Sequence, residues 1–314
     1  MDLARLSFVT GKGGTGKSTV AAAIALATAD CTDDKRSLLA DLDGRLSAAR
    51  MLGLSELSSK GASQRASNGG PPRGDAKIDT NVDAQIESIV VTGRGELEAF
   101  VKRFVPLKAI SRRMLRSRSF GYVGAAAPGL AAFLTMERLR LIAGEAALKD
   151  RYAVVDAPSS GGALELLGVA GGVRDMAPFG TLNRLAGGIE GMLIDPHRFG
   201  VIVTVAPEEP ALREAVESVH RVRGFGITNV SAVLNCAVDD LFDDREMARI
   251  NPLKGHGELA RRRRAMAGRT AETRDALARE KIDFIELPML FRPAIGRREA
   301  AMLAVAIKRQ ITRS

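Results

Sequence analysis

Short runs of consecutive apolar residues alternate with longer helical stretches along most of this 314-residue chain. Most of the runs are continuous rather than alternating in polarity, which is typical of strands buried on both faces of a parallel sheet. With helices between them, they predict an α/β fold with a doubly wound, mostly parallel sheet. The predicted strands are Leu6–Thr10, Ser37–Asp41, Ala153–Asp156, Gly200–Val205, Val230–Asn235 and Phe284–Leu287.

Two segments interrupt this rhythm. Residues 55–77 are polar and rich in Gly, Pro and Ser, which predicts a mobile loop. Residues 96–148 have a mostly helical pattern, and we expect a helical subdomain inserted into the sheet domain. Because no internal repeat is visible, we expect residues 1–314 to form one such domain and not a tandem pair.

Basic amphipathic stretches lie in the helical insert and at the carboxyl end of the chain. The stretch at residues 102–118 could bind a client helix, bind anionic lipid or cover the core with the aliphatic stems of its basic side chains. In the last predicted helix, from Arg297 to Ile311, a membrane anchor is conceivable. A core stripe fits the spacing of Leu303, Ile307 and Ile311 better.

The chain has a net charge of +9, which favours anionic partners such as nucleotides, acidic proteins, nucleic acid or a membrane surface. No apolar run approaches the roughly 18 residues of a spanning helix, and Met1–Thr10 does not resemble a signal peptide. We therefore expect a soluble cytoplasmic protein. The two cysteines, Cys31 and Cys236, are too far apart in sequence to suggest a metal clasp or a disulfide framework.

A glycine-rich segment follows the first predicted strand and precedes an alanine-rich helical run at residues 20–29. From Gly11 to Ser18 it matches the phosphate-binding pattern G-x-x-x-x-G-K-[ST]. Glycines let backbone N–H groups approach phosphate oxygens, and a helix N-terminus adds partial positive charge. We expect Lys17 to reach the β- and γ-phosphates and the Ser18 hydroxyl to bind Mg²⁺. The other expected nucleotide contacts in this loop are Gly11, Gly13, Gly14, Thr15, Gly16 and Thr19.

A second lysine, Lys12, lies inside this loop and gives the sequence Lys-Gly-Gly-Thr-Gly-Lys-Ser. The sequence resembles the deviant Walker A motif of the ArsA/ParA/MinD class of P-loop ATPases. The resemblance implies that Lys12 crosses a dimer interface and contacts the nucleotide of the partner subunit. A cation supplied in trans is worth about 10³–10⁵ in the rate of phosphoryl transfer.

Two carboxylates, Asp41 and Asp43, close the second predicted strand. Because side chains alternate along a strand, both should lie on one side and Leu42 on the other. The segment resembles switch I of the same class, which implies that Asp43 holds the attacking water and contributes to the metal site. Asp41 could assist through Mg²⁺-bound water, and Gly44 replaces the proline that often follows. Alternatively, the two carboxylates cap the next helix.

A third acid, Asp156, follows an apolar strand, which is the Walker B arrangement for holding Mg²⁺ directly or through water. The block that it opens, Asp-Ala-Pro-Ser-Ser-Gly-Gly-Ala-Leu, resembles switch II of the ArsA family, which includes the ATPases that target tail-anchored membrane proteins. Gly162 replaces the usual histidine of that family. The replacement could weaken the coupling between nucleotide state and the partner-binding surface.

The resemblance also implies contacts with the adenine base. Asn235 at the end of a strand would read the adenine edge, because a planar amide can donate and accept at once. Pro288 would form a second wall. The segment Pro207-Glu208-Glu209 and Glu214 resemble a family block near the dimer interface, although an exposed helix start would also account for these acids.

Together, these motifs predict a Mg²⁺-dependent ATPase that works as a homodimer or with a related ATPase subunit. Three roles remain open: an arsenite-pump ATPase, a membrane-protein targeting chaperone, or a ParA/MinD-like positioning ATPase on DNA or a membrane surface. Arsenite would need clustered thiolates, which two remote cysteines do not supply. The switch II block argues against nucleic acid. We therefore expect an ArsA-type ATPase with a membrane-protein, permease or other hydrophobic client.

Overall fold

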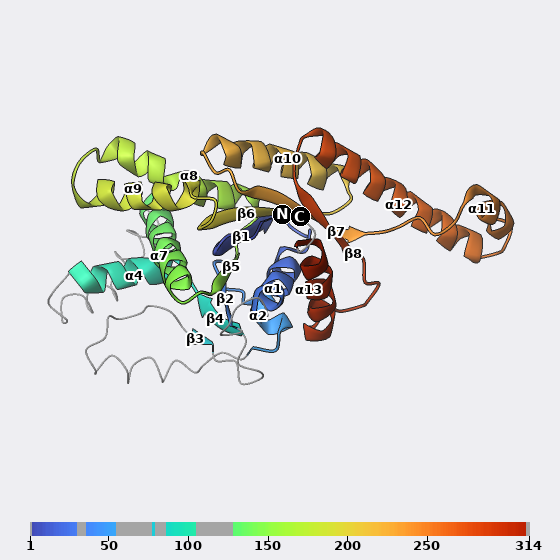
Figure 1. The fold of residues 1–314 in the computed structure, drawn as a ribbon, viewed down its shortest axis with the longest axis horizontal. Coiled ribbons are helices and arrows are strands. Elements are labelled where there is room, and N and C mark those ends of the chain that lie inside the picture. Colours follow the sequence, from blue (N-terminus) through green and yellow to red (C-terminus); the bar gives the residue numbers. More distant parts are fainter. Residues whose placement is uncertain (1, 30–35, 55–76, 79–85, 105–127, 312–314) are drawn as a thin grey trace.

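The computed structural model describes all residues except 1, 30–35, 55–76, 79–85, 105–127 and 312–314 (Figure 1). The described strands form one sheet in the order β3-β4-β2-β5-β1-β6-β7-β8. Neighbours in this sheet are parallel except for β3 and β4, which confirms the predicted parallel α/β fold. The strands are β1 (Leu6–Gly11), β2 (Ser37–Asp41), β3 (Lys77–Ile78), β4 (Ile86–Val90), β5 (Tyr152–Asp156), β6 (Phe199–Val205), β7 (Val230–Ala237) and β8 (Phe284–Pro288).

All six predicted strands are present, with small differences at their ends. The apolar pattern did not predict β4, whose short run contains Glu87 and Ser88 between its apolar residues. It also did not predict the two-residue strand β3. The end of β7 extends to Ala237 because a register shift after Leu234 lets the strand continue beside β8.

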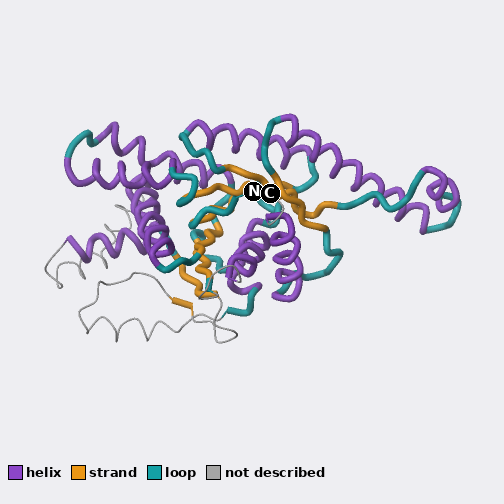
Figure 2. Tube along the Cα trace, in the orientation of Figure 1, coloured by secondary structure: helices purple, strands orange, loops and turns teal. Residues whose placement is uncertain are grey.

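Helices cover both faces of the sheet, as Figure 2 shows. One face carries α1 (Lys17–Ala29), α2 (Ser47–Met51) and α13 (Arg297–Ile311). The other face carries α7 (Pro128–Leu148), α8 (Ser160–Met176), α9 (Gly180–Ile194) and α10 (Glu209–Gly224), with α4 (Gly93–Phe104) packed against α7. The long helix α12 (His256–Arg279) extends away from the sheet, and α11 (Asp244–Ile250) packs at its far end (Figure 1).

The strands contribute to two cores because their side chains alternate between the faces. In β1, Leu6 and Phe8 belong to the core under α7 to α10, whereas Val9 belongs to the core under α1. Helix α1 is rich in buried alanines, and their small side chains allow α13 to pack closely beside it. This packing holds the amino end of α1, where the glycine loop lies, against the sheet.

The carboxyl-terminal helix confirms the core-stripe interpretation. Leu303 and Ile307 of α13 are buried in the core shared with α1, and Ile311 packs against that core. None of the helices in the described ranges is long and apolar enough to cross a membrane.

Parts of two other sequence expectations lie within the described residues. Helices α4 and α7 belong to the helical region expected at 96–148, and α7 buries Phe133, Met136 and Leu139 in the same core as β1. The basic cluster of this region and the loop expected at 55–77 lie mostly outside the described residues. The domain boundaries therefore stay a prediction.

Candidate nucleotide-binding site

The glycine loop connects the end of β1 to the start of α1, as the sequence predicts. Gly11, Gly14 and Gly16 have φ angles of 144°, 88° and 89°, a region that residues with a Cβ rarely adopt. A Cβ on Gly11 would also collide with Thr204, and one on Gly16 with the Asn235 amide. The loop conformation thus requires glycine at these positions.

The loop also has an open side. No described atom lies within 4 Å of a Cβ built on Gly13 or Gly14, so the backbone there faces free space. Thr19, in the first turn of α1, is half-buried. A phosphate can therefore approach the backbone of this loop at the amino end of α1.

The side chain of Lys17 folds back over the loop. Its Nζ donates to the Lys12 backbone oxygen at 3.4 Å. Thr15 N–H donates to the same oxygen at 3.3 Å, and the Thr15 hydroxyl does so at 2.9 Å. Three donors therefore converge on one carbonyl, which holds the loop closed around the lysine that should bind phosphate.

The predicted metal ligands lie together beside the loop. Asp156 is only 6% exposed, and the Ser18 hydroxyl lies close enough to its carboxylate to oppose the rise of its pKa. Asp41 is its register partner on the neighbouring parallel strand β2. Burial raises the pKa of Asp156 to about 6, with the negative charges of Asp41 and Asp43 acting in the same direction, whereas Ser18 and Lys17 oppose the shift.

Asp41 and Asp43 have different surroundings. The buried Asp41 accepts backbone hydrogen bonds from Gly44 at 2.5 Å and Leu46 at 2.9 Å. Burial and the nearby Asp43 raise the pKa of Asp41. Asp43 is more exposed, and its carboxylate contacts the backbone N–H and the guanidinium of Arg45 at 2.9 and 3.7 Å. Asp41 thus holds the turn before α2, which has no side-chain cap, and Asp43 remains the more accessible carboxylate.

Lys12 makes a salt bridge within its own subunit. Its Nζ lies 3.6 Å from a Glu214 carboxylate oxygen on α10. The other Glu214 oxygen accepts a hydrogen bond from the Ser160 hydroxyl at the start of α8. Glu214 thus links the P-loop lysine to the switch II block.

Asn235 is buried and contacts the loop itself. Its Nδ2 donates to the Thr15 backbone oxygen at 2.9 Å, so the side chain supports the P-loop. Pro288 lies at the exposed end of β8, in register with Ala237 at the end of β7. The contacts of Asn235 and Pro288 with adenine stay a prediction.

Thr10 and Thr204 belong to the site but were not found from the sequence. The buried Thr204 hydroxyl lies 2.7 Å from the Thr15 hydroxyl, and the Thr10 hydroxyl donates to the Pro158 backbone oxygen at 2.8 Å. Both threonines are polar residues within buried, mostly apolar strands, which is the signal that could have identified them.

The donor set fits Mg²⁺ bound together with phosphate. The described residues include no group of three or more His, Cys, Asp or Glu side chains that could hold a metal alone. Mg²⁺ usually takes one or two protein carboxylates and completes its oxygen shell with water and substrate phosphates. Ser18, Asp156 and Asp43 supply hard oxygen atoms of that kind.

Comparison with known proteins agrees with this geometry. Residues 6–237 match the CobQ/CobB/MinD/ParA nucleotide-binding domain. The chain belongs to this family. It is 26% identical over 251 residues to ATPase BagA of Mycobacterium tuberculosis, covering 78% of this chain and 68% of that protein. A protein of Mycobacterium bovis designated an ATPase matches with the same identity and coverage. The nucleotide-binding class predicted from the P-loop is thus confirmed.

Replacing Asp156 by asparagine is expected to stabilise the nucleotide-free protein near neutral pH. Because the folded pKa is raised to about 6, the unfolding free energy that depends on Asp156 falls as pH rises from about 4 to 6. Urea unfolding should show that D156N gains about 2 to 3 kcal/mol relative to wild type between pH 4 and pH 7.5. The exposed Asp175→Asn is the control. An equal difference at both pH values would contradict the raised pKa.

Proposed function

We propose that this protein is a Mg²⁺-dependent ATP hydrolase of the ArsA type and that it works as a dimer. The main supporting observation is that Ser18, Lys17, Asp41 and Asp43 lie around the buried Asp156. This cluster combines the cation, the hydroxyl and the carboxylates that phosphoryl transfer requires. The family assignment supports nucleotide binding at the same residues.

Each residue has a distinct task in this proposal. Lys17 and the loop amides bind the β- and γ-phosphates, and their positive charge stabilises the charge that develops on the leaving oxygens. Mg²⁺, held by Ser18, Asp156 and Asp43, would supply electrostatic neutralisation of the phosphates. The accessible Asp43 orients a water molecule toward the γ-phosphate. Asn235 maintains the loop geometry through Thr15.

Lys12 acts in the partner's site. In the isolated chain it pairs with Glu214, and both side chains are partly exposed. Because exposed ion pairs contribute only about 0 to 1 kcal/mol, this salt bridge can exchange for a phosphate across a dimer interface at little cost. When Lys12 exchanges this salt bridge for the partner's phosphate, Glu214 loses its cation. Glu214 also accepts a hydrogen bond from Ser160 at the start of α8.

Helix α8 connects the nucleotide site to an apolar surface. Its 17 residues extend about 25 Å from Ser160 to Met176. At and beyond its end, Met176 and Phe179 are 80% and 88% exposed. Such side chains are typical of interaction surfaces when they are grouped. We propose that a hydrophobic client binds here, and that hydrolysis changes its affinity by moving α8.

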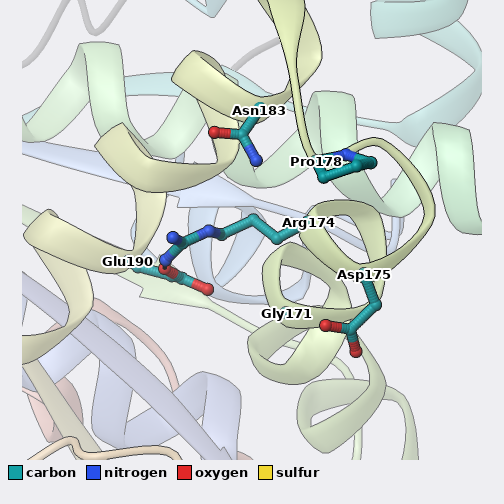
Figure 3. A pocket seen from close by; sticks show the side chains of 6 residues that line it. All are labelled: Gly171, Arg174, Asp175, Pro178, Asn183 and Glu190. Carbon is teal, nitrogen blue, oxygen red and sulfur yellow. Dashed lines mark hydrogen bonds and ion pairs between the residues drawn. The ribbon is translucent and has the colours of Figure 1, made fainter.

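A pocket lies between α8 and α9, next to the turn that joins them, as Figure 3 shows. Pro178 of the turn lines it, and so do the paired side chains of Arg174 and Glu190. This charged border would orient a client whose apolar part contacts Met176 and Phe179. The second candidate function is a ParA/MinD-like ATPase on DNA or a membrane surface, favoured by the net charge of +9.

The first test is ATP hydrolysis by the purified protein with and without Mg²⁺. Saturable release of phosphate that requires Mg²⁺ supports the proposal, whereas absence of turnover over a wide range of protein concentration overturns it. D43N, loaded with ATP, then serves to compare binding of an apolar client helix, DNA and anionic vesicles. Loss of helix binding in Met176→Ser/Phe179→Ser would support the client surface, and DNA or vesicle binding would favour the second candidate.

Replacing Glu214 by glutamine is expected to lower the protein concentration at which dimer-dependent hydrolysis appears. The change breaks the salt bridge that holds Lys12 in its own subunit. Because such a pair contributes about 0.2 to 1 kcal/mol, half-maximal specific activity should appear at a protein concentration about 1.4-fold to fivefold lower. Glu209→Gln, which removes a fully surface pair with Arg213 on the same helix, should leave the curve unchanged. An increase in that concentration would contradict the assigned role.

A further inference from the structure

The hydroxyls of two buried threonines, Thr15 and Thr204, link two backbone oxygens between β1, β6 and the P-loop. The Thr15 hydroxyl donates to the Lys12 oxygen at 2.9 Å and lies 2.7 Å from the Thr204 hydroxyl. The Thr204 hydroxyl in turn donates to the Thr10 backbone oxygen at 3.0 Å. Thr15 is 4% exposed and Thr204 is fully buried, so water cannot replace these bonds.

The two hydroxyl groups have fewer protons than these contacts need. Thr15 and Thr204 carry one hydroxyl proton each, whereas three contacts need one. Because the Thr15 hydroxyl donates to the Lys12 oxygen, its own oxygen is left as an acceptor. The single Thr204 proton then serves two contacts, the Thr10 backbone oxygen and the Thr15 hydroxyl oxygen. Thr204 therefore lies where it can fix the orientation of the Thr15 hydroxyl.

The Thr15 hydroxyl donates to the carbonyl that Lys17 also contacts. Lys17 Nζ now donates to the Lys12 oxygen at 3.4 Å. When a phosphate takes that ammonium group, the Lys12 oxygen loses one donor. The Thr15 hydroxyl still donates to that oxygen, and Thr204 keeps this hydroxyl oriented through their 2.7 Å contact. The Lys12 peptide would then keep its orientation while Lys17 moves to the phosphate.

We propose that Thr204 is a positioning residue for nucleotide binding, which holds the Lys12 peptide of the P-loop through the Thr15 hydroxyl. Thr204 contacts the phosphate-binding loop at two places. Its hydroxyl contacts the Thr15 hydroxyl, and its atoms fill the space beneath Gly11. The inference rests on the proposed function, because it concerns ATP binding at the same loop. It adds a residue outside the glycine motif that sets the affinity of the site.

The test compares two substitutions that separate the hydroxyl from the shape of Thr204. T204V keeps the volume beneath Gly11 and removes the hydroxyl, whereas T204S keeps the hydroxyl. The expected result is an ATP dissociation constant about tenfold higher for T204V and within about twofold of wild type for T204S. The KM for ATP should rise similarly for T204V, while kcat changes little because Thr204 contacts no reacting atom.

Ser88→Ala is the matched control, since it removes a buried strand hydroxyl that has no hydrogen-bond partner in the described structure. Titration with a fluorescent ATP analogue, together with a melting curve for each variant, gives the readout. If T204V melts earlier but binds ATP as tightly as wild type, Thr204 is merely structural and the inference is overturned. If wild type itself binds no ATP, the proposed function fails, and the inference fails with it.

Discussion

Replacing Lys12 by alanine should lower the turnover of ATP by about 10³-fold or more while leaving nucleotide binding largely intact. In its own subunit the Lys12 ammonium group pairs with Glu214, so we expect that subunit's phosphate site not to depend on it. Its contribution is expected only when a second subunit brings it to the phosphates. Single-turnover hydrolysis and equilibrium ATP binding measure the two effects separately.

Lys149→Ala is the control for the general effect of removing one cation, because Lys149 is exposed and forms an ion pair with Glu145, one helical turn earlier. That variant should hydrolyse ATP at the wild-type rate. If K12A loses binding and turnover together, Lys12 belongs to the phosphate site of its own subunit. If K12A hydrolyses ATP normally, the deviant Walker A interpretation is wrong.

Replacing Asp43 by asparagine should lower kcat by about 10²- to 10⁴-fold, the range expected for loss of a group that orients or deprotonates a nucleophile. The asparagine has nearly the same size but cannot accept a proton. Because Asp43 is partly exposed and its ion pair is with the exposed Arg45, the fold should tolerate the change. Phosphate release and ATP affinity are the measurements, and kcat should fall while affinity changes little.

The neighbouring Asp41→Asn is the informative comparison. Both oxygens of Asp41 accept backbone N–H groups of Gly44 and Leu46, so this change should distort the turn before α2 and lower stability as well as activity. A kcat loss confined to D41N, with D43N near wild type, would exchange the roles assigned to the two carboxylates.

The P-loop and the sheet could be predicted from the sequence because both depend on local patterns. Continuous apolar runs identify parallel strands, and the spacing from Gly11 to Ser18 is specific for a phosphate-binding loop when it lies between a strand and a helix. Strand β4 lacks such a signal, since Glu87 and Ser88 break its apolar run. Its place in the sheet depends on pairing with β2, which no local pattern reveals.

The site contacts that the sequence did not reveal are those between distant segments. The adenine contact of Asn235 stays a prediction, and the sequence does not reveal that its amide donates to Thr15, 220 residues earlier. Thr204 lies 189 residues from Thr15 and has no motif of its own. Glu214 resembled a family block, but only the fold shows that it joins Lys12 to Ser160. These contacts arise from strand order and helix packing, which local residue spacing does not encode.

The central claim is that each subunit completes the ATP site of the other through Lys12. Mixing K12A with D43N tests it most directly, because each variant should be inactive alone. In a mixed dimer, the K12A subunit retains Asp43 and receives Lys12 from the D43N subunit. After mixed dimers are verified by cross-linking, an equal mixture should recover about a quarter of wild-type turnover, since about half of the dimers are mixed and each has one complete site. Mixed dimers that remain inactive would contradict the account.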